Sequence, residues 1–509
     1  MSGAGAPDPA PAPVVPSSRW AGDRLVVTTR GGTMIATDGM LAYADGLRRV
    51  AAAAEEALRV VRVADAETDA ATLGAMRSGL RAEGRIDRAR DALGRARELA
   101  ERVAGAVTAS ARHYREADAR AGALAHRSAA TGAAMLGSLA FLARLVNPLP
   151  AALLPLLLPA VVETLWPARA GKAPGDPGAV GGFLTEHPEV LTNPLVARLV
   201  RLGVTSVDEF ANTATGVPPW LAIPLGDEEH GVAGVETSGL GLMAVGAVAS
   251  GGRLFAETPV SVERTAERRF EIGASPKAGG TAPIGAAERL TRVPEHGRVR
   301  IERYEAPGMA PRYVVYVGPT ETFSPVSDRR AWDMTSNVGG VVGVDAGSIR
   351  AVEQAMTDAG ITSEDEVQLV GFSQGGLVAG RIAASSEWNA VGLETYGAPL
   401  GTTTLDGSIR GFEAVHTDDI VPATAGPRED AGRMLIQREA YPEGVPIPND
   451  LPAPAHQLRA YLETARAVDR AQSAAVRDEV AALDAFTADV ASAPGATLTV
   501  AEYRGYRER

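Results

Sequence analysis

Three polar residues in the last third of the chain have the types and the order that nucleophilic catalysis by serine requires. Ser373 lies in Gly371-Phe372-Ser373-Gln374-Gly375, a G-x-S-x-G pattern. Serine attacks poorly unless a histidine accepts its proton and a carboxylate orients that histidine. Of the seven histidines, only His416 and His456 follow Ser373. The chemistry that this set would support is acyl transfer.

The residues around Ser373 predict the local structure that a serine nucleophile needs. An apolar run at 367–370 precedes it, and apolar residues recur at helical spacing over 377–382. Strand, sharp turn and helix together are typical of a nucleophile elbow, in which the serine sits on a strained turn with its hydroxyl exposed. In a chain with 56 glycines the five letters alone are weak evidence, and a glycine-rich turn without chemistry remains the alternative.

A carboxylate and a base follow in the required order. In "GFEAVHTDDIVPATAG", Asp418 and Asp419 come just after a strand-like run, where the loops of a sheet's carboxyl edge collect functional residues. His456 lies on the approach to a helix about 40 residues later. We expect His416, at the end of the strand beside the acid, to make a structural hydrogen bond, and His456 to be the base. The remaining histidines show no metal-ligand spacing, so we expect no metal.

Three separated segments, "LVGFSQGG", "TYGAPLG" and "DDIVPA", resemble the class 3 lipases and related actinobacterial α/β-hydrolases. The resemblance covers about residues 298–465. It implies that Asp419, directly before Ile-Val-Pro, is the triad acid, that Asp418 is a variable flanking residue, and that the base lies downstream. It implies ester cleavage through an acyl-enzyme with no cofactor.

Ester cleavage also needs hydrogen-bond donors for the developing oxyanion. We expect one donor to be the backbone N–H of Gln374, the residue after the nucleophile, and the other to come from the loop after "RYVVYVG". The resembled family usually reads Pro-Gly-Thr in that loop. This chain reads Gly318-Pro319-Thr320, and because proline has no N–H, Thr320 is the candidate.

The organisation along the chain predicts an α/β domain behind a helical one. The later part alternates strand and helix patterns, which predicts an α/β-hydrolase-type, mostly parallel sheet with flanking helices. Ahead of it, Ala-, Arg- and Glu-rich helical periodicity predicts an all-α hairpin or bundle. The expected units are a disordered leader and small hairpin (1–38), a helical domain (39–166), a linker with short helices (167–234), the α/β-hydrolase domain (235–492) and a C-terminal tail (493–509).

The composition argues against some classes of binding partner. The formal net charge of -12 argues against nucleic acid, which is bound through clustered Lys and Arg. There is no Cys, so the sequence offers no disulfide, thiol nucleophile or thiolate metal site. Residues 129–166 are the most apolar part, but Arg144 and several prolines interrupt them. We expect them to form buried core or an acyl-facing cap, with peripheral membrane contact and a true span as alternatives.

The helical region carries one further pattern. In "HYREADARAG", Tyr114 and Asp118 are four residues apart and share a helix face. A helical pair followed by Tyr-x-x-x-Asp resembles substrates of the actinobacterial type VII secretion pathway, although the Trp-x-Gly turn of the small secreted proteins is missing. The resemblance implies export to the envelope or medium without a cleaved signal peptide, with a secretion-system or helical partner at 39–128. The alternatives are ordinary surface residues and a cytoplasmic protein.

The leading functional hypothesis is therefore a serine esterase or lipase acting on an acyl or lipid ester. Two alternatives share parts of the same evidence. One is a catalytically inactive hydrolase fold that serves as a secreted interaction protein, and the other is a type VII-exported phospholipase toxin.

Overall fold

The fold is taken from a computed structural model of the chain. It describes residues 25–29, 32–34, 37–67, 76–146, 189–226, 257–272, 281–295, 297–322, 329–401, 403–426 and 433–508. Several expected segments lie outside these residues: the start of the leader, the apolar stretch beyond Val146, residues 167–188 of the expected linker and the strand-like run "GLMAVGAVAS".

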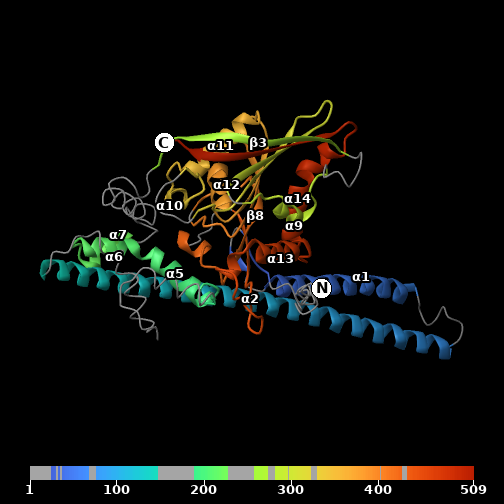
Figure 1. Ribbon diagram of the computed structural model, residues 1–509. Helices are drawn as coiled ribbons and strands as arrows, with labels where there is room; N and C mark the ends of the chain where they lie inside the picture. The colour runs from blue at the N-terminus through green and yellow to red at the C-terminus, as the bar shows by residue number, and fades with distance from the viewer. Residues whose placement is uncertain are drawn as a thin grey trace, which may run out of the picture.

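A ten-stranded mixed sheet with helices on both faces forms the centre of the structure, which is an α/β arrangement (Figure 1). The strand order is β2-β1-β9-β8-β7-β6-β5-β4-β10-β3. The strands are β1 (Val26–Thr29), β2 (Gly32–Met34), β3 (Val260–Glu271), β4 (Arg298–Glu305), β5 (Arg312–Val317), β6 (Val367–Phe372), β7 (Ala390–Tyr396), β8 (Arg410–His416), β9 (Met434–Arg438) and β10 (Thr497–Arg507).

The expectation of a mostly parallel sheet is wrong. Only the block β5-β6-β7-β8-β9 is parallel, so four of the nine neighbouring pairs are parallel and five are antiparallel. The short connection between β4 and β5 forces those two strands to run in opposite directions. At the other edge, the β1–β2 hairpin adds to β9.

The expected C-terminal tail is also wrong, because residues 497–507 form β10, which lies between β4 and β3. Its buried positions, among them Leu498, Val500 and Tyr503, pack into the two cores. A strand inserted inside a sheet pairs on both sides, so this segment is part of the folded unit.

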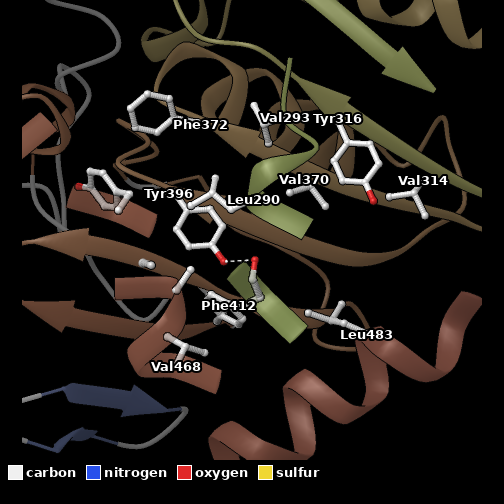
Figure 2. Close-up of a cluster of buried hydrophobic side chains, with 14 of the residues drawn as sticks. Leu290, Val293, Val314, Tyr316, Val370, Phe372, Tyr396, Phe412, Val468 and Leu483 are labelled. Atoms are coloured by element: carbon white, nitrogen blue, oxygen red, sulfur yellow. Dashed lines mark hydrogen bonds between the residues drawn. The ribbon is translucent and has the colours of Figure 1, made fainter. Parts of the chain in front are cut away.

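The two faces of the sheet carry separate cores because side chains alternate along each strand. On β5, Val314 and Tyr316 enter one cluster, whereas Val315 and Val317 enter the other. Helices α9 (Gly285–Thr291), α13 (Leu458–Asp469) and α14 (Ala474–Ala491) cover the first face. Helices α11 (Gly347–Asp358) and α12 (Gln374–Ser385) cover the second, with α10 (Met334–Val341) beside them. Figure 2 shows the first cluster, in which strand residues such as Tyr396 face helix residues such as Leu290.

Two long helices follow the β1–β2 hairpin in the chain and come before the other eight strands of the sheet. Helix α1 (Thr37–Glu67) and helix α2 (Met76–Val146) run antiparallel, since Arg97 of α2 bonds Glu55 of α1 at 2.5 Å and Arg48 of α1 bonds Thr108 of α2 at 2.9 Å. Helix α2 has 71 residues, a length of roughly 107 Å at 1.5 Å per residue. Within the described residues, none of the helices combines the length and apolar character that crossing a membrane requires.

Three short helices link the front of the chain to the sheet. They are α5 (Pro194–Thr205), α6 (Val207–Ala214) and α7 (Pro219–Gly226), and they lie along α2 (Figure 1). Gly137 of α2 marks the closest approach, because a Cβ there would lie 2.0 Å from Thr213 Oγ1 and 2.3 Å from the Phe210 carbonyl oxygen. The absence of a side chain at Gly137 therefore allows α6 to pack directly on α2.

Candidate active site

Ser373 occupies a sharp turn between β6 and α12. Its backbone has φ 56° and ψ -125°, a conformation that residues with a Cβ rarely adopt and that costs on the order of 1–3 kcal/mol. The flanking glycines make the turn sterically feasible. A Cβ on Gly371 would lie 2.3 Å from the Gly375 carbonyl oxygen, and a Cβ on Gly375 would lie 2.1 Å from the Val317 carbonyl oxygen. The strand, turn and helix expected from the sequence are therefore present.

The three residues expected to act together lie within hydrogen-bonding distance of one another. His456 Nε2 is 2.8 Å from Ser373 Oγ, and His456 Nδ1 is 2.7 Å from Asp419 Oδ2. A carboxylate only accepts hydrogen bonds, so Nδ1 carries the proton and Nε2 is left to accept the serine proton. The serine comes from the turn after β6, the acid from the loop after β8, and the histidine from η5 (Pro454–His456), just before α13.

Asp419 is buried and held by three donors. Its Oδ1 accepts the N–H of Val421 at 2.9 Å, and its Oδ2 accepts both His456 Nδ1–H and the hydroxyl of Tyr461, the latter at 2.9 Å. Burial alone would raise the pKa of Asp419, but the attraction of His456 and the donated hydrogen bonds outweigh burial and hold this pKa below its ordinary value. The carboxylate therefore stays ionised beside the imidazole.

His456 is held between an aromatic ring and a polar support. Its imidazole stacks on Phe372, the residue before Ser373, with ring centroids 5.3 Å apart. The preceding Ala455 donates its N–H to Thr192 Oγ1 at 3.3 Å, and Thr192 also forms a β-bridge with Asp419. Helix α5, which starts just after Thr192, packs on η4 (Pro422–Ala425) behind Asp419. The segment expected to be a linker with short helices (167–234) thus supports the loops of both Asp419 and His456.

His416 and Asp418 lie beside the triad but face other partners. His416 Nδ1 is 2.7 Å from the Ala455 carbonyl oxygen and its Nε2 is 2.7 Å from Thr464 Oγ1. Burial lowers the pKa of His416 to about 4, so the ring is neutral. Asp418 accepts the N–H groups of Ala440 and Tyr441, each at 2.9 Å. Both residues hold loops in place, which for His416 is the structural hydrogen bond that the sequence led us to expect.

The two candidate oxyanion donors lie on neighbouring segments. Gln374 is the first residue of α12, where a helix cannot pair its own N–H groups. Thr320 is buried in the loop after β5, and that loop starts against the first turn of α12 through the Val317 and Gly318 carbonyls. The N–H of Gly318 bonds the Arg298 carbonyl at 2.9 Å and Pro319 has none, so Thr320 is the donor candidate of this tripeptide.

This arrangement can perform nucleophilic acyl transfer. It provides a hydroxyl, a base 2.8 Å away that is oriented by an ionised acid, and a helix N-terminus next to the hydroxyl. No group of three or more His, Asp or Glu side chains is arranged to hold a metal ion anywhere in the part of the chain that the structure describes.

Comparison with protein-family models, with curated proteins and with solved structures finds no match to this chain. The sequence did not indicate Phe372, Tyr461 or Thr192 as parts of the site. Phe372 could have been found from its place next to the serine, whereas nothing in the sequence connects Tyr461 or Thr192 to Asp419.

Proposed function

We propose that this protein is a serine hydrolase that cleaves carboxylic esters. The observation that carries the proposal is the unbroken chain of hydrogen bonds from Ser373 Oγ through His456 to Asp419, at 2.8 Å and 2.7 Å. A buried turn with a positive-φ serine is strained, and such strain is typical of functional sites.

The proposed mechanism uses these side chains in sequence. Ser373 Oγ attacks the ester carbonyl while His456 Nε2 takes its proton. Asp419 holds the imidazole tautomer and stabilises the imidazolium that forms. The N–H groups of Gln374 and Thr320 are the proposed donors to the oxyanion. His456 then returns the proton to the leaving alcohol, and water, activated by the same histidine, releases the acyl group from Ser373.

The finer features of the fold support the same reading. The parallel block β5–β9 followed by helices on both faces, with the serine after β6 and the acid after β8, supports an α/β-hydrolase-type domain. The antiparallel α1–α2 pair supports a helical hairpin in front of it. We further propose an acyl or lipid ester as substrate, from the apolar composition of 129–166, and type VII-like export with a helical partner at 39–128, from the Tyr114-x-x-x-Asp118 pattern within α2.

The proposal is tested by ester hydrolysis with matched variants. Purified full-length protein is assayed on p-nitrophenyl esters of increasing acyl length, and is labelled with a fluorophosphonate probe. We expect Ser373→Ala and His456→Ala to lower turnover on the order of 10⁴-fold or more, because members of a triad act as a unit. His416→Asn is the comparison variant, since His416 is also buried and hydrogen-bonded but contacts Asp419 only through Tyr461, so we expect it to lose far less activity than His456→Ala.

The pattern of losses decides the outcome. Loss of labelling in Ser373→Ala, with a much smaller loss of activity in His416→Asn than in His456→Ala, would support the proposal. Absence of labelling in the wild-type protein, or activity that survives His456→Ala but not His416→Asn, would refute it and favour the inactive-scaffold alternative or a different base.

A further inference from the structure

Tyr461 is a buried residue that contacts the triad acid. It lies in the first turn of α13, its side chain is fully enclosed, and its hydroxyl is 2.9 Å from Asp419 Oδ2. Nothing in the hydrolysis steps described above requires this residue. Its hydroxyl could simply fill space, or it could fix the orientation and charge of the Asp419 carboxylate.

The direction of the hydrogen bond is fixed by a second contact. The backbone N–H of His416 donates to the Tyr461 hydroxyl oxygen at 3.1 Å. An amide N–H can only donate, so the phenol oxygen accepts there and its own proton is directed at the carboxylate. Asp419 Oδ2 thus accepts two hydrogen bonds at once, one from the Tyr461 hydroxyl and one from His456 Nδ1–H.

The surroundings hold the phenol ring in one position. It stacks on the His416 ring with centroids 3.8 Å apart and 14° between the planes, and Phe372 lies 5.6 Å away on another side. Gly397, in the "TYGAP" segment, has φ +60°, and a Cβ there would lie 2.9 to 3.0 Å from the Tyr461 ring and hydroxyl. The absence of a side chain at Gly397 leaves space for the Tyr461 ring beside Asp419. The segment "TYGAP", one of those that resemble the lipases, therefore allows Tyr461 to reach Asp419.

We propose that Tyr461 is a positioning residue that fixes the plane and moderates the charge of Asp419; this rests on the proposed function of the site. Together with the Val421 N–H on Oδ1, its hydroxyl leaves the carboxylate no second orientation. Asp419 then presents Oδ2 to His456 Nδ1 in every molecule, which keeps His456 Nε2 aimed at Ser373. The tyrosine acts only through Asp419 and does not touch the reacting atoms.

The test is a double-mutant cycle in the full-length protein with Tyr461→Phe, Asp419→Asn and the pair. Phenylalanine keeps the ring stacked on His416 and removes only the hydroxyl. We expect Tyr461→Phe to lower kcat for a p-nitrophenyl ester about tenfold, the size of one hydrogen bond to a charged group, with little change in KM. In the Asp419→Asn background the same change should cost less than about twofold, because its target has lost its charge.

A control and a second measurement separate this role from mere packing. Tyr304→Phe also removes a buried hydroxyl bonded to a carboxylate, that of Glu302, in a part of the core away from the triad, and should leave kcat unchanged. Proton NMR of the His456 Nδ1–H should show a downfield shift in Tyr461→Phe, because Asp419 then carries more charge towards His456. This resonance can be assigned by its loss in His456→Gln.

The outcomes distinguish the two proposals. Suppose the wild-type protein hydrolyses esters. If Tyr461→Phe then has the same kcat, the positioning role is refuted and the hydrolase proposal stands. The same holds if Tyr461→Phe lowers kcat equally in the wild-type and Asp419→Asn backgrounds and leaves the His456 Nδ1–H resonance in place. If no ester is hydrolysed, the proposed function fails, and the resonance alone decides whether Tyr461 acts on Asp419.

Discussion

The buried histidine beside the triad should make the protein less stable as the pH falls below neutrality. His416 is enclosed between Tyr461, Ala455 and Thr464, and burial lowers its pKa to about 4 from the ordinary 6.5. Its Nδ1 donates to the Ala455 carbonyl, and its Nε2 lies 2.7 Å from the Thr464 hydroxyl. The same hydroxyl oxygen accepts a hydrogen bond from Arg438 at 3.1 Å, so a second imidazole proton would be placed close to a guanidinium. The folded protein therefore keeps this ring neutral at a pH where the unfolded chain protonates it.

The linkage between protonation and folding gives the sign and size of this change in the free energy of unfolding. Between pH 6.5 and about 4 the unfolded state binds more protons at this residue than the folded state, so the free energy of unfolding falls as the pH falls. The full contribution is present above pH 6.5, and about 1.4 kcal/mol is lost per pH unit below it, which amounts to about 3 kcal/mol at pH 4. Raised pKa values of the buried acids Glu394, Asp333 and Asp418 act in the opposite direction in this range, so a comparison with a variant is needed.

The variant is His416→Asn, which keeps a donor near the Ala455 carbonyl and does not titrate. Urea unfolding is followed from pH 7.5 to 4.5 by tryptophan fluorescence, because Trp332 is buried in the core on one face of the sheet and Trp388 packs against that core. We expect the wild-type protein to be the more stable at pH 7.5 and its advantage to shrink by about 2 to 3 kcal/mol at pH 4.5. A stability difference that stays constant across this range would refute the reasoning, because it would mean that His416 takes up a proton equally in both states.

Two further predictions concern glycines. Gly375→Ala should abolish fluorophosphonate labelling and destabilise the protein by about 4 kcal/mol or more, since the added Cβ would lie 2.1 Å from the Val317 carbonyl oxygen. The control is Gly94→Ala in α2, where no atom lies within 4 Å of an added Cβ, and it should raise the stability measured by thermal unfolding by up to about 1 kcal/mol. Equal effects of the two substitutions would contradict the packing argument. Gly137→Ala should separate α6 from α2, seen as faster amide hydrogen exchange at 207–214 with 367–385 unchanged, and unaltered exchange at 207–214 would count against direct helix contact.

The grouping of Ser373, Asp419 and His456 could be predicted from the sequence because the patterns that indicate it are local. The elbow around Ser373 combines a buried strand, small residues and a helical repeat within about twenty residues. The order of Ser373, Asp419 and His456 along the chain left only His416 as a rival base. In the structure His416 contacts Ala455 and Thr464, whereas His456 contacts Ser373.

What could not be predicted depends on contacts between distant segments. Residues 497–507 alternate apolar and polar side chains like any half-buried strand, but nothing local says that they insert between β4 and β3. The β1–β2 hairpin likewise gives no sign that it extends the sheet at β9. Thr192 and Tyr461 are ordinary residues by type, and only the folded chain brings them to Asp419.

The support that Thr192 gives to the loops of Asp419 and His456 limits how far this protein can be shortened. A fragment that starts after residue 234 would still contain Ser373, Asp419 and His456. It would lack the threonine that ties Ala455 to the acid loop, the helix that backs η4 and the strand that caps β9. The segments before residue 235 therefore support the loops that carry Asp419 and His456, and removing these segments would leave the two loops without that support.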